Sequence, residues 1–275
     1  MRAAIQVAGL SGLFLSSGQA LAAYQMNLAP GVTTFSQGAY DIHMMVLWIC
    51  VVIGAVVFGA MTYSIIKHRK SKGAVAAEFH ENTTIEIIWT IIPFLILIAM
   101  AIPATKVLLA MEDTSNSDMS IKVTGYQWKW HYDYLGEDVS FFSNISTPDA
   151  ANLATNASVE KDETYLLDVD NRMVIPINKK VRLLFTSNDV IHSWWVNAFG
   201  LKKDAIPGFI NEGWINVPEP GVYRGKCAEL CGKNHGFMPV VVEAKSEEDY
   251  IAWLAGQKAE AAEAAASAEK TWTMA

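Results

Sequence analysis

Residues 42–66 read IHMMVLWICVVIGAVVFGAMTYSII, and residues 85–111 read IEIIWTIIPFLILIAMAIPATKVLLAM. An α-helix needs about 20 predominantly apolar residues to cross a bilayer, and both runs reach that length. Pro93 and Pro103 are compatible with a membrane helix that packs against other helices. The two runs therefore predict a transmembrane hairpin. The competing interpretation of each run is a helix buried in the core of a soluble protein.

The segment between the two runs, residues 67–84, sets the predicted topology. It reads KHRKSKGAVAAEFHENTT and carries Lys67, Arg69, Lys70 and Lys72. Short loops that are rich in Lys and Arg remain in the cytoplasm. We therefore expect residues 67–84 in the cytoplasm, and both residues 23–41 and the long C-terminal portion in the periplasm.

Residues 1–22 match a secretory signal peptide. The chain begins with the positive MR, continues with a short apolar core and reaches ALA at 20–22, a small-x-small cleavage site. Gln6 and Ser11 interrupt the apolar core, so an ordinary disordered N-terminus is the alternative.

From residue 118 to residue 246 the pattern changes to short runs such as KKVRLLFTSN and MPVVVEA, separated by Gly, Pro, Asn and Asp. Short strands with turns about every 8 to 12 residues predict a β-sandwich or barrel. Within the C-terminal segment 247–275, residues 247–254 predict a closing helix, and an Ala/Glu-rich tail follows that is either helical or disordered. The predicted fold class is an α+β membrane protein, with a two-helix transmembrane hairpin followed by an all-β domain.

The composition narrows the class of protein. Of the 275 residues, 52% are hydrophobic, which suits one globular domain with a few membrane spans. The formal net charge of −7 argues against nucleic acid as a partner and favours a cationic one. The three cysteines are Cys50, inside the first apolar run, and the pair Cys227 and Cys231, and so few exclude a disulfide framework.

The stretch CAELCGKNHGFM at 227–238 carries the chemistry together with a distant histidine. Two thiols, two imidazoles and a thioether form a soft ligand set that selects copper over hard cations: Cys227, Cys231, His192, His235 and Met238. A mononuclear blue copper site uses one Cys, two His and a weak Met, so a second Cys favours a bridge to a second copper. The alternatives for the CxxxC pair are an ordinary disulfide and the thiol pair of a copper-delivery chaperone with a thioredoxin fold.

These motifs resemble those of a known family. The run CAELCGKNHGFMP is similar to the copper A motif of cytochrome c oxidase subunit II, and four further stretches resemble that family: GYQWKWHYDY, LLDVDN, DVIHSWW and LKKDAIPGFINE. The resemblance extends from Leu28 to about Leu254 and is closest to the bacterial enzymes with a separate cytochrome donor. It implies a cupredoxin domain, a Greek-key sandwich, at 118–246 with a binuclear copper A centre. No CxxCH occurs, so no covalent haem is expected.

The resemblance also implies the role of each matching residue. Six residues are expected to hold the copper pair: the bridging Cys227 and Cys231, His192 and His235 on one copper each, the weak ligand Met238, and Glu229 through its backbone carbonyl. The side chain of Glu229 is expected to hold a magnesium or manganese ion shared with subunit I. Trp128 matches the aromatic residue through which the electron enters.

Further matches concern docking and protons. The residues expected to dock a basic cytochrome c are Asp133, Asp168, Asp170 and Asp189, although a merely solvated acidic face is the alternative. Glu86 matches the mouth of the lysine-type proton pathway, and its alternative role is an interfacial cap on a helix N-terminus. The family commonly has Tyr where Lys129 stands and Glu where Asp133 stands, and neither departure affects a ligand.

The function implied by the resemblance is that of subunit II of a proton-pumping cytochrome c oxidase. Such a subunit accepts electrons from cytochrome c and passes them to haem in subunit I, where oxygen is reduced to water. The implied partners are subunits I and III, cytochrome c and membrane lipids, with no nucleic acid. The implied location is the bacterial inner membrane, as a multi-pass protein with its copper domain in the periplasm.

Three other classes of protein are alternatives. A quinol oxidase subunit would share the hairpin and the sandwich but lack the copper ligands. A nitrous oxide reductase would share the copper motif but need a large extra catalytic domain. A copper-delivery or copper-sensing membrane protein would bind metal without docking a cytochrome.

Overall fold

The computed structural model describes residues 27–78, 80–147 and 163–273, with side chains described up to residue 263. The segment 1–22, where a signal peptide is predicted, lies outside the described residues, and that prediction stays a prediction. The chain divides into the compact units Met1–Pro30 and Gly31–Ala275, and all helices and strands described below belong to the second unit.

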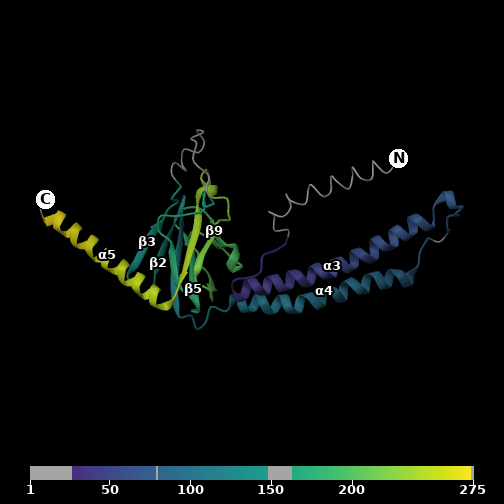
Figure 1. Ribbon diagram of the computed structural model, residues 1–275, viewed down its shortest axis with the longest axis horizontal. Helices are drawn as coiled ribbons and strands as arrows, with labels where there is room; N and C mark the ends of the chain where they lie inside the picture. Colours follow the sequence, from purple (N-terminus) through teal and green to yellow (C-terminus); the bar gives the residue numbers. More distant parts are fainter. Residues whose placement is uncertain (1–26, 79, 148–162, 274–275) are drawn as a thin grey trace, which may run out of the picture. The chain divides into compact units, whose positions relative to one another are not determined.

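Helices α3 (Thr34–Lys67) and α4 (Thr83–Glu112) form the predicted hairpin and run side by side in opposite directions (Figure 1). A short 3-10 helix, η1 (Lys70–Lys72), lies in the loop between them. Both helices are long and apolar enough to cross a membrane, and none of their most apolar stretch is buried inside the protein. Side chains such as Trp48 and Phe58 are exposed instead, which suits a lipid environment.

Helix α3 begins ahead of the apolar run that predicted it, because a capping box stabilises an earlier start. The Thr33 hydroxyl accepts the Ser36 amide N–H at 3.2 Å, and the Ser36 hydroxyl accepts the Thr33 N–H at 2.9 Å. These bonds satisfy two amide donors that a helix N-terminus otherwise leaves unpaired. Asn82 caps α4 in a similar way by accepting the Ile85 N–H at 3.2 Å.

The remainder of the unit is a sandwich of two five-stranded sheets, as the sequence predicts. The first has the order β3-β2-β1-β5-β8, with strands β3 (Val139–Ser143), β2 (Lys129–Tyr134), β1 (Met119–Tyr126), β5 (Val181–Ser187) and β8 (Asn211–Ile215). The second has the order β4-β10-β9-β6-β7, with strands β4 (Met173–Pro176), β10 (Pro239–Lys245), β9 (Gly221–Cys227), β6 (His192–Val196) and β7 (Leu201–Ala205). Each sheet contains one parallel pair, β1 with β5 and β4 with β10, and the other pairs are antiparallel.

The core lies between the sheets because the side chains alternate along each strand. In β2 the side chains of Trp130, Tyr132 and Tyr134 are buried, whereas Lys129 and His131 lie on the other face and are partly exposed. Successive residues of a strand point to opposite faces, so one face of β2 enters the core. Burying one such large side chain contributes about 1.5–3 kcal/mol. The core therefore fixes the strands whose ends carry the candidate ligands.

Helix α5 (Glu247–Thr273) begins beside the sandwich and extends away from it toward the C-terminus (Figure 1). The Ser246 hydroxyl caps it by accepting the Asp249 N–H at 3.1 Å. Its first turns pack on the domain through the largely buried Tyr250 and through Trp253, whose ring lies 5.3 Å from that of Tyr134. The backbone stays helical to Thr273, so the described part of the Ala/Glu-rich segment takes the helical one of the two forms expected for it.

Candidate metal centre

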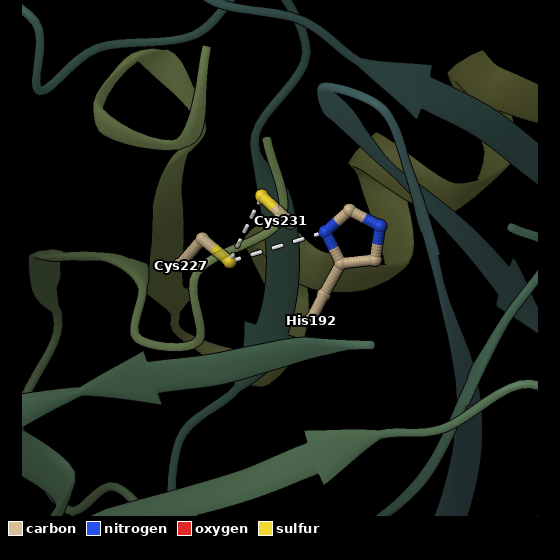
Figure 2. Close-up of side chains that lie close together, drawn as sticks. All are labelled: His192, Cys227 and Cys231. Atoms are coloured by element: carbon tan, nitrogen blue, oxygen red, sulfur yellow. Dashed lines mark hydrogen bonds between the residues drawn. The ribbon is translucent and has the colours of Figure 1, made fainter. Parts of the chain in front are cut away.

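The pairing of β6 with β9 brings together residues that are far apart in the sequence. His192 is the first residue of β6, and Cys227 is the last residue of β9. The register pairs Trp194 with Cys227, which places His192 beside the thiol (Figure 2). The loop after β9 carries Cys231 and leads into the short 3-10 helix η4 (His235–Phe237).

The side chains converge as two thiol–imidazole pairs. The Sγ atom of Cys227 lies 3.9 Å from Nδ1 of His192, and the Sγ atom of Cys231 lies 3.5 Å from Nδ1 of His235. The two sulfurs are 3.8 Å apart, and the ligand atoms of His192, Cys227 and Cys231 all lie within 4.8 Å of one another. The arrangement offers one imidazole beside each of two neighbouring sulfurs.

Two further residues named from the sequence contact Cys227 through their backbone carbonyls. The backbone carbonyl of Glu229 lies 3.3 Å from Sγ of Cys227, while the Glu229 residue itself is exposed. Met238 is buried, and its carbonyl accepts the Cys227 N–H at 2.9 Å. Met238 is thus tied by its backbone to the strand that ends in Cys227.

Burial and neighbouring groups give the thiols of Cys227 and Cys231 different pKa values. Although burial opposes ionisation of Cys227, hydrogen bonds from His192 and from the backbone of Ser193 lower the pKa of its thiol to about 7. Burial and the adjacent Cys227 raise the pKa of Cys231 to about 12. Thiolates are the form that binds metal, so a metal ion has to displace a proton from Cys231.

Asp189 orients the His192 ring. Its Oδ1 atom lies 2.9 Å from Nε2 of His192, which leaves Nδ1 directed at Cys227. The same carboxylate accepts the Gln127 N–H at 2.7 Å and the Val190 N–H at 2.6 Å. Partial burial opposes the effect, but these hydrogen bonds lower the pKa of Asp189 and keep the carboxylate ionised. A carboxylate bonded to the second nitrogen of a ligand imidazole fixes its orientation.

Two glycines allow the strands to approach closely enough to build this pocket. A Cβ atom on Gly125 would lie 2.7 Å from the His192 ring, and one on Gly225 would lie 1.9 Å from the Trp195 carbonyl oxygen. Both positions lack the space for any side chain. Gly225 in particular permits the contact between β9 and β6 that carries Cys227 to His192.

Trp128 contacts the ligand loop directly. Its indole Nε1–H donates to the Cys231 carbonyl at 3.2 Å, and Gln127 Nε2 donates to the same oxygen at 2.8 Å. A Cβ atom on Gly232 would lie 3.2 Å from the Trp128 ring. Trp128 is only partly buried, so it links the ligand loop to the surface of the domain.

The four predicted docking acids do not form one cluster around the ligands. Asp168 pairs with Arg172 at 3.2 Å and with Arg224 at 3.7 Å. Asp170 accepts both N–H groups of Asn144, the backbone one at 2.7 Å and the side-chain one at 2.9 Å. Asp133 lies on the partly exposed face of β2. Asp189 alone among the four touches a candidate ligand.

Glu86 lies apart from the ligands, in the first turn of α4. It is exposed and lines a shallow apolar groove with Thr83, Ile87, Thr90 and Ile91. The Thr90 hydroxyl donates to the Glu86 backbone carbonyl at 2.8 Å. The candidate metal ligands and Glu86 therefore belong to separate sites of the chain.

The orienting role of Asp189 and the contact of Gln127 with the ligand loop were not expected from the sequence. The spacing Asp-x-x-His in DVIH was the available signal for the first. The second depends on a hydrogen bond between residues 104 positions apart, for which the sequence carries no local signal.

Comparison with known proteins shows which family the chain resembles over most of its length. Residues 119–245 match the family model described as the periplasmic domain of cytochrome c oxidase subunit II, and residues 22–107 match its transmembrane domain. The chain is 41% identical over 239 residues to a probable cytochrome c oxidase subunit 2 of Rickettsia bellii, covering 87% of this chain and 86% of that one. It is 36% identical to cytochrome c oxidase subunit 2 of Cereibacter sphaeroides, covering 90% and 88% of the two chains.

Among solved structures, the chain is similar to the periplasmic domain of subunit II of cytochrome oxidase of Bradyrhizobium japonicum. The two are 36% identical with a TM-score of 0.48, and the match covers 54% of this chain and 98% of that one.

Proposed function

Since the chain belongs to the cytochrome c oxidase subunit II family, we propose that it accepts single electrons from cytochrome c at a copper pair and passes them to haem in subunit I of a proton-pumping oxidase. Family membership makes it a membrane protein with a periplasmic domain and a component of a haem–copper oxidase, and the proposal concerns the path of the electron. The observation that carries it is the pair of neighbouring sulfurs, each with its own imidazole.

The chemistry of the donor set fits copper. Two sulfurs, two imidazole nitrogens and a thioether are soft donors; His192, Cys227, Cys231 and Met238 are buried, and the adjacent carboxylate of Asp189 bonds to His192. Cys227 and Cys231 would bridge the two ions, and His192 and His235 would bind one ion each. Met238 and the Glu229 carbonyl would complete the set. A copper pair held by these residues would supply one-electron redox chemistry with little change in bond length.

The protein's own residues would keep the site rigid and dry. The β6–β9 pairing holds His192 against Cys227, and the core buries both side chains. Asp189 holds the His192 ring, so the ligand keeps its orientation when the charge of the site changes. Trp128 would carry the electron inward, because its indole is hydrogen-bonded to the Cys231 carbonyl.

The remaining parts of the proposal concern the assembled oxidase. The exposed Glu229 side chain would hold a magnesium or manganese ion together with subunit I, and subunit III and lipids would contact other surfaces. Glu86 would admit protons from the cytoplasm toward the oxygen-reducing site. The basic loop 67–84 supports a bacterial inner-membrane protein with its sandwich in the periplasm. The export signal predicted at 1–22 is part of the same proposal.

Copper loading of the full chain in detergent tests the central claim. We expect two coppers per chain, a purple mixed-valence spectrum, and rapid bleaching of that spectrum by reduced cytochrome c. Saturation at one copper with a blue-copper spectrum would overturn the binuclear assignment. A binuclear centre that cytochrome c fails to reduce would instead favour copper delivery or sensing.

A further inference from the structure

A single lysine holds the linker between α4 and the sandwich. Residues 113–118 connect the end of α4 to the start of β1. The Nζ group of Lys180 donates to the carbonyl of Asp113 at 2.8 Å and to that of Ser115 at 2.6 Å. The Lys180 backbone N–H donates to the Asp118 carboxylate at 2.7 Å, and the Lys180 carbonyl accepts the Asp118 N–H at 2.9 Å. Lys180 therefore binds the linker at its start, in its middle and at its end.

Trp214, in β8, joins this lysine to both helices of the hairpin. The Nζ atom of Lys180 lies 4.3 Å from the centre of the Trp214 ring, within the range of a cation–π contact. The indole N–H of Trp214 donates at 3.2 Å to the carbonyl of Ala110, in the last turn of α4. The same ring meets the buried ring of Phe35, in the first turn of α3, edge to face with their centres 4.3 Å apart. One side chain of the sandwich thus contacts both helices.

Further bonds at the start of α3 and the end of α4 strengthen this joint. The buried Thr33 hydroxyl donates at 2.7 Å to the carbonyl of Phe199, in the 3-10 helix η3 (Asn197–Phe199). Glu112, the last residue of α4, pairs with Lys203 of β7 at 2.7 Å. A segment moves readily when it has few buried contacts and its backbone groups bond to water. The joint has the opposite character, so we expect the hairpin and the sandwich to behave as one body.

We propose that Lys180 and Trp214 are positioning residues that hold the ligand pocket at a fixed distance and orientation relative to the membrane hairpin. The ligand pocket, formed by His192, Cys227 and Cys231, lies in the same sandwich. Within the described part of the chain, neither positioning residue contacts a candidate ligand, so both act through the sandwich. The inference rests on the proposed function: the reduced pocket loses one electron, a ferric haem in subunit I gains it, and no bond forms or breaks.

Pulsed dipolar electron paramagnetic resonance on the full chain in detergent tests the joint directly. The two spins are a nitroxide on Cys50, which is exposed on α3, and the mixed-valence copper pair. We expect one narrow distance distribution in the wild type. Lys180→Met keeps an unbranched side chain but loses the ammonium donors, so its distribution should be clearly broader. Lys180→Arg retains the charge and the donors and should stay close to the wild type.

Lys179→Met is the matched control. It removes the same charge from the adjacent residue, which pairs at 3.1 Å with Glu247 of α5 instead, so its distribution should stay narrow. Trp214→Phe keeps an aromatic ring but loses the N–H to Ala110, and it provides a second variant, with a smaller broadening, should Lys180→Met fold poorly. A broad distribution in the wild type, or equal widths in Lys179→Met and Lys180→Met, would overturn the inference. Absence of the mixed-valence signal from the wild type would instead mean failure of the proposed function.

The intact oxidase complex separates positioning from a merely structural role. In Lys180→Met, copper reduction by cytochrome c should keep its wild-type rate, because the pocket itself is unchanged. Transfer from copper to haem should slow about tenfold, since a misplacement of about 1 Å can cost up to about a hundredfold in rate. Stopped-flow absorbance at copper and haem wavelengths measures both rates. Lower copper content with both rates reduced together would leave Lys180 only a structural role, and unchanged transfer to haem would mean that other subunits position the sandwich. Either result would overturn the inference.

Discussion

The ligand pocket of the sandwich and the Glu86 groove of α4 differ in how much of each site this chain supplies. In the pocket, His192, Cys227 and Cys231 are buried, and each has a partner within the chain. Glu86 is exposed on a helix whose apolar side chains also face outward. The first site is built by folding alone, whereas the second would acquire its surroundings from other subunits in the function proposed above. A change in the pocket should therefore be detectable in the isolated chain, and a change at Glu86 only in the complex.

The strongest test of a self-contained pocket is Cys227→Ser. We expect complete loss of the mixed-valence spectrum in the isolated chain, because one remaining thiolate cannot bridge two coppers symmetrically. Cys50→Ser is the matched control, since Cys50 is exposed on α3, and it should keep the spectrum unchanged. An intact binuclear spectrum in Cys227→Ser, measured by optical absorption and copper analysis, would remove Cys227 from the ligand set.

Glu86→Gln tests the Glu86 groove of α4, whose proposed role depends on other subunits of the oxidase. Gln cannot ionise, so oxygen consumption by the complex should fall about a hundredfold, while copper reduction by cytochrome c stays fast. If Glu86 only stabilises the N-terminus of α4, turnover should be nearly normal and stability should drop by at most about 1 kcal/mol. Parallel stopped-flow and oxygen-electrode measurements decide between these roles. Glu81→Gln, which precedes the Asn82 cap, is the control and should retain turnover.

Asp189→Asn tests whether the pocket depends on the residue that holds its ligand. Asn cannot reproduce the ionised acceptor for His192, so we expect about a tenfold loss of copper affinity in the isolated chain, with the spectrum retained at saturation. Competition titration with a copper chelator measures the loss. Asp133→Asn removes the same charge from the outer face of β2 and should leave affinity unchanged. Equal losses in both variants would assign the effect to charge and not to orientation of the ring.

The smallest expected effect concerns helix α5, which packs on the sandwich that carries the ligand pocket. Ser246→Ala removes the cap of α5 and should lower the free energy of unfolding of a soluble fragment, residues 113–263, by about 1 kcal/mol. Ser140→Ala, at an exposed position on β3, should change it little. Denaturant unfolding monitored by tryptophan fluorescence provides the measurement. If the copper spectrum of the Ser246→Ala variant also changes, the ligand pocket depends on the packing of α5 as well as on its own hydrogen bonds.

The sequence predicted those features that depend on local pattern. Apolar runs of membrane length predicted α3 and α4, and the chemistry of the donor types predicted the cluster around Cys227. The earlier start of α3 was missed because it depends on hydroxyl caps at Thr33 and Ser36, and not on hydrophobicity. The order of the strands in each sheet could not be predicted from the sequence. Strand pairs such as β1 with β5 join residues about sixty positions apart. Asp189 was assigned to docking because the Asp-x-x-His spacing in DVIH does not by itself establish a bond to His192.

The close approach of β9 to β6 at Gly225 predicts which substitutions the protein tolerates at this position. Every substitution at this codon adds at least a Cβ atom, which would meet the Trp195 carbonyl oxygen at 1.9 Å and force β9 away from β6. The strand that moves is the one ending in Cys227, so the lesion would be in copper assembly although no ligand is altered. In a saturation mutagenesis screen under respiratory selection, Gly225 should be as intolerant as the ligand positions. Its neighbour Lys226, which is exposed, should accept most residues.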